Sequence, residues 1–493
     1  MDHQEQLGQQ DLTLDPEDWG GLRELGHKML DDMFDYMQGR RESPAWQPIP
    51  DEVKERLTVP VPQEPQAAEA VYDEFLRDIL PYQMGTTHPR FWGWVIGTGT
   101  PMGVLAEMLA ATVNPNLGGG DHVANYVEAQ VIEWCKQMLG FPAEASGVLV
   151  SGGSTANLIG LTVARNAYDG FDMRQKGLHG TTHQMVVYGS NQMHSSIQRA
   201  VELLGLGNEA LRLIPVNDAF QIDIAALQAA ITADKAAGHI PLAVVGNAGT
   251  VNTAAFDDLS ALADLCEREG LWFHVDGAFG ALAALAPELR SLTAGMERAD
   301  SLAFDMHKWM YIPFDVACTL VRDRKAHYRA FTLTPDYLRH MERGAGAGSH
   351  WFSDYSLELS RSFRALKVWM SIKNYGIEKC GQLIYQNVQQ AHYLTQLIEA
   401  EPQLELLAPT SCNIVCFRFC TAGLTDDALN ELNEELLIRL HETGTAVPSY
   451  TRIDGKFAIR VAITNHRSRL EDFELLARSV VEFGQALLAE KSH

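Results

Sequence analysis

The sequence lacks what several protein classes need. Its 39 Lys and Arg stand against 63 Asp and Glu, a formal net charge of −24 at pH 7. A surface of that sign repels phosphate backbones and anionic lipids, so we expect no nucleic acid and no membrane among its partners. The N-terminal stretch MDHQEQLGQQDLTLD has neither the basic start nor the apolar core of a secretory signal, and no apolar run approaches the roughly 18 residues of a spanning helix. We therefore expect a cytoplasmic protein.

Paired cysteines are also missing. The chain has 7 Cys, an odd number, and none forms a Cys-x-x-Cys pair. Cys412, Cys416 and Cys420 are evenly spaced, but the surrounding NIVCFRF alternates like a strand, and no histidine lies close by to complete a metal site. We predict buried thiols in a reducing compartment and no bound metal.

Length and patterning point to several structural units. The 493 residues, 46% of them hydrophobic, allow a large core. Apolar residues of 15–40 recur at helical spacing, and a Pro-rich break follows them. We predict an N-terminal helical segment over 1–84, a large α/β domain over 85–376 and a small α+β domain over 377–493.

The central part alternates between two kinds of pattern. Strand-like apolar runs are separated by helical stretches such as 154–166, 223–234 and 257–269. This alternation predicts an α/β fold with a mostly parallel, seven-stranded sheet and helices on both faces. The expected strands are GVLV, MVVYG, LRLIPV, LAVVGNAG, LWFHVDGA, SLAFDM and ACTLVRD.

A turn of small residues follows the first of these strands. The segment 151–155, SGGST, leads directly into the helix ANLIGLTVARN. Such a turn presents backbone N–H groups at the positive end of a helix, a combination that binds phosphate. A serine-capped tight turn explains the same residues equally well. The segment is neither a P-loop nor a Gly-x-Gly-x-x-Gly fingerprint, which argues against a nucleotide cofactor.

Two polar residues follow other strands. Asp276 ends the run FHVD, and a carboxylate there is costly to bury without a cationic partner. The small residues Gly277 and Ala278 beside it leave room for a flat ring. His194 follows MVVYG at a helix start, where imidazole can stack on a ring. A turn-capping aspartate and a structural histidine are the alternative interpretations.

The segment FDMHKWM, 304–310, places Lys308 among apolar residues, one strand-helix-strand unit after Asp276. A phosphate-binding turn, a strand-end aspartate, a stacking histidine and this lysine together match one ligand. Pyridoxal 5′-phosphate has a phosphate, a pyridine nitrogen, a flat ring and an aldehyde that a lysine amine binds covalently.

These motifs resemble those of the group II pyridoxal-phosphate-dependent amino-acid decarboxylases, the family of aromatic-L-amino-acid, histidine and glutamate decarboxylases. The resemblance covers about residues 15–470 and implies fold type I of the pyridoxal-phosphate-dependent transferases. It also implies pyridoxal 5′-phosphate as cofactor and a homodimer with the active site at the subunit interface, in which the N-terminal helical segment packs. The matching stretches are SGGSTANL, MHSSIQRAVELLG, NAGTVNTAAFDDL, HVDGAFGA, DMHKW, TPDYL and SRSFRALKVW.

The resemblance implies a role for each matching residue. Lys308 is expected to hold the cofactor, Asp276 to pair with the pyridine nitrogen, and His194 to stack on the ring opposite Ala278. Tyr337, in a lid-like segment rich in Gly and charge, is expected to protonate the substrate's Cα. The further cofactor contacts implied are Gly153, Ser154, Thr250 and His307.

Two residues that resemble family positions have open roles. Asp305 stands where the animal aromatic decarboxylases have asparagine, and an acid beside a phosphate is unfavourable unless it orients His307 or turns away. Arg460, in FAIRVAI, resembles an arginine of the family's C-terminal domain that reaches the active site.

The substrate is predicted from fewer residues. The segment HPRFWGWVIG aligns with the one that lines the family's substrate pocket, and Trp94 and Val95 suit an aromatic side chain. Ser360 stands where histidine decarboxylases have serine. We therefore predict decarboxylation of an aromatic L-amino acid to the amine and CO₂, with histidine second and acidic amino acids (glutamate, aspartate, cysteine sulfinate) third.

Two wider alternatives stay open. One is another fold-type-I enzyme, such as an aminotransferase or a cysteine desulfurase, although the lid segment 332–352 has no cysteine for the latter. The other is a cofactor-binding regulator without turnover, against which the presence of both Lys308 and Tyr337 argues.

Overall fold

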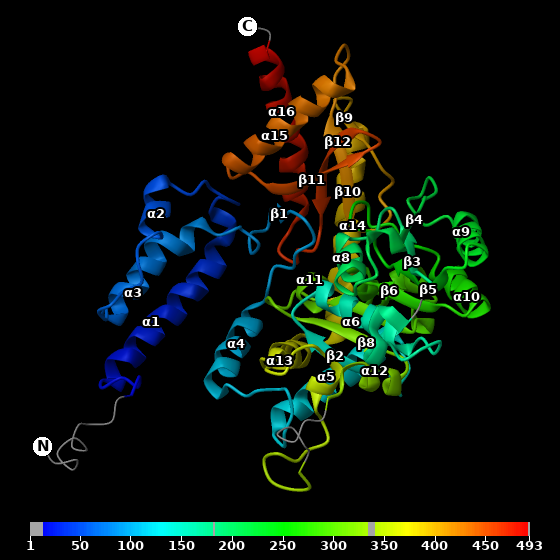
Figure 1. The fold of residues 1–493 in the computed structure, drawn as a ribbon. Coiled ribbons are helices and arrows are strands. Elements are labelled where there is room, and N and C mark those ends of the chain that lie inside the picture. Colours follow the sequence, from blue (N-terminus) through cyan, green and yellow to red (C-terminus); the bar gives the residue numbers. More distant parts are fainter. Residues whose placement is uncertain (1–12, 181–182, 334–340, 492–493) are drawn as a thin grey trace, which may run out of the picture.

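The computed structural model describes residues 13–180, 183–333 and 341–491. Its N-terminal helices form an arm that stands beside the body of the molecule (Figure 1). Asp18 caps the first of them by accepting backbone N–H groups of its first turn, and the Tyr72 hydroxyl donates to Asp32 at 2.9 Å, which ties the third helix to the first. The arm consists of α1 (Trp19–Gln38), α2 (Asp51–Arg56) and α3 (Ala68–Glu74).

The central sheet has seven strands in the order β2-β8-β7-β6-β5-β3-β4. Neighbouring strands run parallel, except that β8 lies antiparallel between β2 and β7. The mostly parallel seven-stranded sheet predicted from the alternating pattern is therefore confirmed. Its strands are β2 (Ser146–Val150), β3 (Met185–Ser190), β4 (Leu211–Ile214), β5 (Ile240–Asn247), β6 (Trp272–Asp276), β7 (Ser301–Asp305) and β8 (Ala317–Val321).

Helices cover both faces of this sheet. The helices of this part of the chain are α4 (Pro101–Val113), α5 (Val123–Leu139), α6 (Gly153–Ala167), α7 (Met173–Lys176), α8 (Ser195–Leu203), α9 (Ile224–Ala236), α10 (Leu259–Glu269), α11 (Met306–Trp309), α12 (Arg324–Phe331) and α13 (Arg364–Tyr375). Helices α9 and α10 pack on one face, and α6 and α8 pack on the other. Because side chains alternate along a strand, β6 turns Phe273 and Val275 toward α10 and His274 and Asp276 toward α6.

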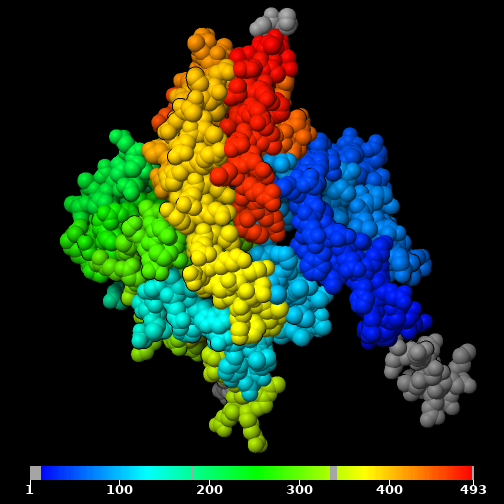
Figure 2. Space-filling model, turned by 180° about the vertical axis from the view of Figure 1, so that it is seen from behind, coloured from blue at the N-terminus to red at the C-terminus, as the bar shows by residue number. Residues whose placement is uncertain are grey.

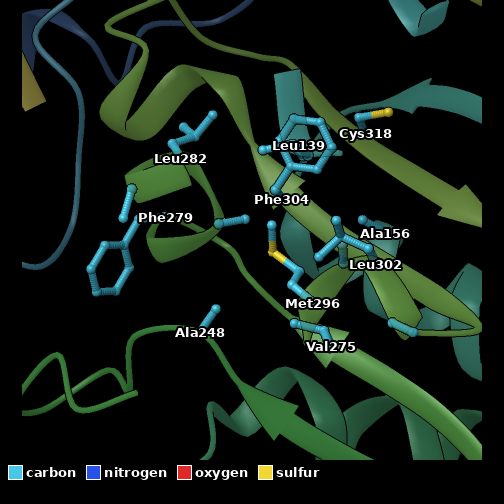
Figure 3. Packing of buried hydrophobic residues seen from close by; sticks show 14 of the residues in the cluster. Leu139, Ala156, Ala248, Val275, Phe279, Leu282, Met296, Leu302, Phe304 and Cys318 are labelled. Atoms are coloured by element: carbon cyan, nitrogen blue, oxygen red, sulfur yellow. The ribbon is translucent and has the colours of Figure 1, made fainter. Parts of the chain in front are cut away.

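The apolar core lies directly beneath the strand ends. Figure 3 shows Val275, Leu302 and Phe304, from β6 and β7, in one buried cluster that also includes Leu282. All are fully buried, and burial of each such large side chain contributes about 1.5–3 kcal/mol. The ends of β6 and β7 therefore rest on a close-packed base.

The C-terminal part builds a second sheet of five strands in the order β1-β11-β12-β10-β9. It consists of β1 (Phe91–Trp92), β9 (Leu404–Leu406), β10 (Ile414–Phe419), β11 (Val447–Ile453) and β12 (Lys456–Ala462), with helices α14 (Ile377–Ala400), α15 (Asp426–Glu442) and α16 (Leu470–Lys491). Helices α14 and α16 lie side by side (Figure 2).

Strand β1 pairs in parallel with β11, although the sequence pattern assigned this stretch to the large α/β domain. The Trp92 ring stacks on Phe473 of α16 with ring centroids 4.8 Å apart, which anchors β1 in the second sheet. The loop that follows β1 is thereby held between the two sheets. In the part of the chain that the structure describes, no helix has both the length and the hydropathy that a membrane span requires.

Candidate active site

A cavity of about 250 Å³ lies where the carboxyl ends of β5 and β6 meet the C-terminal sheet. Ligands in α/β proteins bind at this edge of the sheet. The sequence-predicted residues in its wall are Trp94, Val95, His194, Asp276, Ala278, Lys308 and Arg460. A hollow of about 650 Å³ beside α14 and α16 contains none of them. The cavity therefore unites residues that are far apart in the sequence.

Asp276 is the last residue of β6 and is buried. Its Oδ2 accepts a hydrogen bond from the Asn157 amide at 3.0 Å, and its Oδ1 accepts one from the Ala278 N–H at 3.1 Å. Burial raises the pKa of the Asp276 carboxyl, and the nearby Lys308 amine opposes that rise. Both hydrogen-bond donors are neutral, so a cationic group in the cavity would stabilise the ionised carboxylate.

Lys308 lies on α11, directly after β7. Met306 and Trp309 on either side of it are fully buried, whereas the Lys308 side chain keeps 21% of its surface exposed at the cavity. Its Nζ forms an ion pair of 2.7 Å with Oδ2 of Asp305. The apolar neighbours thus fill the core while the amine faces the cavity.

Asp305 is nearly fully buried, and its Oδ1 has no hydrogen-bond partner among the described residues. The other carboxylate oxygen, Oδ2, meets Lys308 and lies 4.0 Å from Nε2 of His307. The Asp305 carboxylate is therefore paired with a lysine, and its distance to His307 is too long for a hydrogen bond. Its Oδ2 would also lie 2.8 Å from a Cβ at Gly153, so the acid does not turn away from the phosphate-binding turn. The role of Asp305 stays open.

His194 is the N-cap residue of α8 and lines the cavity beside Asp276. Its Nδ1 accepts the Ser196 backbone N–H at 3.1 Å and lies 2.8 Å from the Ser196 hydroxyl. Because Nδ1 acts as an acceptor, the ring proton is on Nε2. Desolvation by the surrounding protein lowers the pKa of His194, so the ring is neutral near pH 7 and offers an exposed face to the cavity.

The helix start at Gly153 has the properties expected of a phosphate site. Helix α6 has no side-chain cap, and its first helical hydrogen bond runs from the Ala156 N–H to the Gly152 carbonyl. The N–H groups of the first turn therefore have no partner within the helix. A Cβ at Gly153 would lie 2.8 Å from Oδ2 of Asp305, so only glycine leaves this space open. Ser154 is exposed at the same turn.

His307 is buried near this helix start. Its Nδ1 accepts the Val316 N–H at 3.1 Å, so its proton is on Nε2. The Cε1 atom would lie 3.7 Å from a Cβ at Gly152, which places the ring beside the phosphate-binding turn. Burial lowers the pKa of His307 and keeps the imidazole neutral.

Two predicted residues do not line the cavity, and a third is not among the described residues. The Thr250 hydroxyl accepts the Ala255 N–H at 3.0 Å and lies 3.1 Å from Thr253 Oγ1, so it is engaged within its own loop. Ser360 is exposed and is not part of the cavity wall. Tyr337 lies outside the described residues. The roles of these three stay predictions.

Arg460 of β12 is buried and binds the loops of the cavity together. Its guanidinium donates to the carbonyl groups of Trp94 at 2.9 Å and Asn252 at 3.1 Å, to that of Val251, and to the Ser449 hydroxyl at 3.1 Å. All these acceptors are neutral, and burial lowers the pKa of Arg460 to about 10. Trp94 has a backbone φ of 51°, a left-handed conformation that its bond to Arg460 helps to hold.

Sequence reasoning missed part of the cavity wall. Asn247 ends a strand that was predicted and Phe279 follows another, whereas Ser449 and Tyr450 belong to β11, which was not predicted. The alternation in VPSYTRI gave a weak strand signal. Nothing local to that segment shows that it faces a site formed mainly by residues more than 100 positions earlier.

The residues present fit pyridoxal 5′-phosphate. The cavity offers a lysine amine, a buried carboxyl with neutral donors and an exposed imidazole face, and the helix start with unpaired N–H groups lies beside Asp305, the ion-pair partner of Lys308. Each matches one group of that cofactor.

Comparison with known proteins establishes the family. The pattern of the pyridoxal-dependent decarboxylase conserved domain matches residues 50–420. The chain belongs to this family and is a pyridoxal-phosphate-dependent amino-acid decarboxylase with pyridoxal 5′-phosphate as its cofactor.

Similar proteins cover almost the whole chain. The aromatic-L-amino-acid decarboxylase of Bacillus atrophaeus is 34% identical over 92% of this chain and 93% of its own. Phenylacetaldehyde synthase of Arabidopsis thaliana is 30% identical over 92% of this chain and 93% of its own. The crystal structure of TDC from Oryza sativa with PLP and tryptamine matches with a TM-score of 0.88 and 27% identity over 96% of this chain and 100% of that chain. The predicted fold type I is therefore confirmed.

Proposed function

We propose that the protein decarboxylates an aromatic L-amino acid to the corresponding amine and CO₂. The aromatic wall of the cavity carries this proposal. Trp94 and Tyr450 are 55% and 62% exposed, and Phe279 lines the cavity with them. Aromatic rings that face a cavity bind a flat apolar side chain through contact area and stacking. The similarity to the aromatic-L-amino-acid decarboxylase of Bacillus atrophaeus supports the same substrate class.

The described residues suit the steps of this reaction. When bound, pyridoxal phosphate supplies a ring that takes up the electron pair left as the bond between Cα and the carboxylate breaks. The first turn of α6 and His307 would hold the phosphate, and His194 and Ala278 would contact the ring. Asp276 keeps the pyridine nitrogen protonated. Asp305, 2.7 Å from Lys308 Nζ, offers an anionic partner to the lysine whenever its amine is free.

Arg460 supplies the cavity with a positive charge that no carboxylate neutralises directly. We assign to it the electrostatic attraction of the substrate's α-carboxylate. Because its hydrogen bonds hold the loops at Trp94 and Asn252, little of the guanidinium is free to recognise a second, side-chain carboxylate. This favours aromatic over acidic amino acids as substrates.

CO₂ release over the twenty amino acids plus DOPA and cysteine sulfinate tests the substrate class. We expect kcat/KM to be highest for tryptophan, tyrosine, phenylalanine or DOPA. Trp94→Ala should lower that value roughly tenfold through lost ring contact, and Trp94→Phe should restore part of it. A preference for histidine, with unchanged kinetics in Trp94→Ala, would show that imidazole is the natural side chain, and a preference for glutamate would assign Arg460 to the side chain.

Amine rather than aldehyde is the proposed product. Similar proteins include phenylacetaldehyde synthases, so both outcomes occur among relatives. This chain has Tyr337, which the resemblance makes the proton donor to Cα, and His194 in the cavity. We expect Tyr337→Phe to reduce amine formation about 10²–10⁴-fold, the usual contribution of a general acid. Product analysis with a hydrogen peroxide assay checks this: wild type that gives stoichiometric aldehyde and peroxide would contradict the proposal.

We also propose a homodimer. The arm of α1–α3 exposes large apolar side chains, including Trp19, Leu22 and Met29, and so does α4 with Met108 and Val113. Large apolar side chains exposed on surface helices are typical of an interface that a second copy covers. Sedimentation equilibrium should give twice the chain mass of 54.6 kDa, and a monomer at micromolar concentration would contradict the proposal.

A further inference from the structure

A buried hydrogen-bond network lies beneath Asp276, on the side away from the cavity. Asn157 of α6 occupies its centre and is almost fully buried. Its amide nitrogen donates to Oδ2 of Asp276 at 3.0 Å and to the Ser196 hydroxyl at 3.0 Å. Its amide oxygen lies 2.9 Å from Nε2 of His274, on the same strand as Asp276. One amide thus contacts the carboxyl, the serine behind His194 and a second histidine.

The partners of His274 determine where its proton lies. His274 is fully buried, and burial lowers its pKa to about 3, so the ring is neutral and carries one proton. Its Nδ1 lies 2.8 Å from the Ser301 hydroxyl, which itself accepts the Trp272 indole N–H at 2.8 Å. The Ser301 hydroxyl proton can therefore point at Nδ1, and the ring proton on Nε2 then donates to the Asn157 oxygen. A Cβ at Gly160 would lie 2.7 Å from the ring, so a glycine makes the space for it.

The direction of this network is coupled to the charge of Asp276. If the Asn157 amide were reversed, its oxygen would face the Asp276 carboxyl, which is tolerable only if that carboxyl carries a proton. His274 would then need its proton on Nδ1. A His274 ring protonated on Nε2 is therefore compatible with an anionic Asp276, whereas a ring protonated on Nδ1 requires a protonated Asp276.

We propose that Asn157 and His274 are positioning residues that together hold Asp276 in its anionic form. Asn157 donates the hydrogen bond that stabilises the carboxylate. His274 holds the Asn157 amide with its nitrogen toward Asp276, because it donates to the amide oxygen. Lys308 and His194 face the same carboxyl from α11 and from the start of α8, and they contribute through space rather than through this network. The inference rests on the proposed pairing of Asp276 with the cofactor's ring nitrogen.

The effect on pH dependence has a definite sign. Loss of the Asn157 donor raises the pKa of Asp276, so at a given pH less of it is anionic. The negative charge of Asp276 stabilises a protonated ring nitrogen of the coenzyme. When that charge is lost, the ring nitrogen gives up its proton at a lower pH. A hydrogen bond to a charged group corresponds to a shift of about one pH unit or more.

The tautomer of His274 is measured first, in the full-length protein without coenzyme and with ¹⁵N-labelled histidine. We expect a neutral ring protonated on Nε2 throughout the range from about pH 5 to 9. Its signal is identified by its loss in His274→Gln. An Nδ1–H tautomer would overturn the inference, because it requires the reversed amide.

The second measurement follows the ring nitrogen of ¹⁵N-labelled coenzyme in the holoenzyme as pH is raised. Asn157→Leu and His274→Asn should each lower the midpoint by about one unit. His274→Gln should keep it, since its amide nitrogen can stand where Nε2 stands and donate to Asn157. Unchanged midpoints in both Asn157→Leu and His274→Asn would overturn the inference.

His327 offers a matched control. It is fully buried on α12, with Nδ1 2.9 Å from the Ser146 hydroxyl and Nε2 2.8 Å from the Tyr355 carbonyl, and it does not line the cavity. His327→Gln should lower the melting temperature without moving the midpoint, and a midpoint that moved with it would overturn the inference. If Asp276 does not pair with the coenzyme's ring nitrogen at all, Asp276→Ala leaves the ¹⁵N signal of that nitrogen unchanged, whereas the His274 tautomer remains Nε2–H. That result is therefore distinguishable from a failure of this inference.

Discussion

Lys308→Ala is expected to yield a folded protein that binds no coenzyme covalently and releases almost no CO₂ from any amino acid. The cavity presents the Lys308 amine beside Asp276, and an alanine there has no nucleophile for the aldehyde. The loss of kcat should exceed about 10²–10⁴-fold, the contribution typical of one proton-transferring group, because the covalent anchor is lost as well. The intact mass after borohydride reduction, together with CO₂ release, measures both effects.

Two further variants make this result specific. Lys308→Arg keeps a cation opposite Asp305 but cannot bind the aldehyde, so it should resemble Lys308→Ala in activity while preserving the charge of the site. Lys136 is a buried lysine whose Nζ donates to the carbonyl groups of Ala143 at 2.5 Å and Ala145 at 3.1 Å. Lys136→Ala should lose stability and keep its covalent coenzyme. The same mass increment from reduced coenzyme in Lys308→Ala as in wild type would show that a different lysine holds the cofactor.

Asp276→Ala is expected to have the second largest effect, a fall in kcat of about 10²–10³-fold, as when a preorganised electrostatic group is removed from an active site. Without the carboxylate, the cofactor's ring nitrogen is not held protonated, and the ring is a poorer acceptor of the electron pair. Single-turnover CO₂ release and the ¹⁵N shift of the ring nitrogen should change together.

Asp300 provides the comparison for Asp276. It lies at the opposite edge of the same sheet, just before β7, where its Oδ2 accepts the Phe273 N–H at 2.8 Å and burial likewise raises its pKa. Asp300→Ala should reduce thermal stability and leave kcat close to that of wild type. Equal losses of kcat in the two variants would show that Asp276 acts through stability rather than chemistry.

The sequence could predict that the site residues lie close together, because of the geometry of a parallel sheet. His194, Asp276 and Lys308 each follow a separate strand-like run, and the carboxyl ends of parallel strands meet at one edge. The same local logic identified the turn at Gly153. The sequence did not predict the ion pair between Lys308 and Asp305. Asp305 ends β7 and Lys308 lies on α11, so their side chains meet only because the strand ends and the helix begins at these residues.

The C-terminal half of the cavity was harder to predict. Arg460 was recognised only by resemblance, and Tyr450 was missed. Both reach the site through strand pairings that the sequence did not predict, those of β1 with β11 and of β11 with β12. Asn157 looked like any polar residue in the helix ANLIGLTVARN. Its importance comes from His274 and Asp276, which are more than 100 residues away in the sequence.

The sequence by itself determined the alternation of strands and helices, the residues at the strand ends and the set of chemical groups that pyridoxal phosphate needs, because these depend on short-range periodicity and spacing. Only the tertiary structure decided which aromatic side chains line the cavity, which acid faces the lysine amine, and which amide and imidazole support Asp276. Those contacts join segments that are distant along the chain, and their geometry follows from how two sheets and α6 pack together.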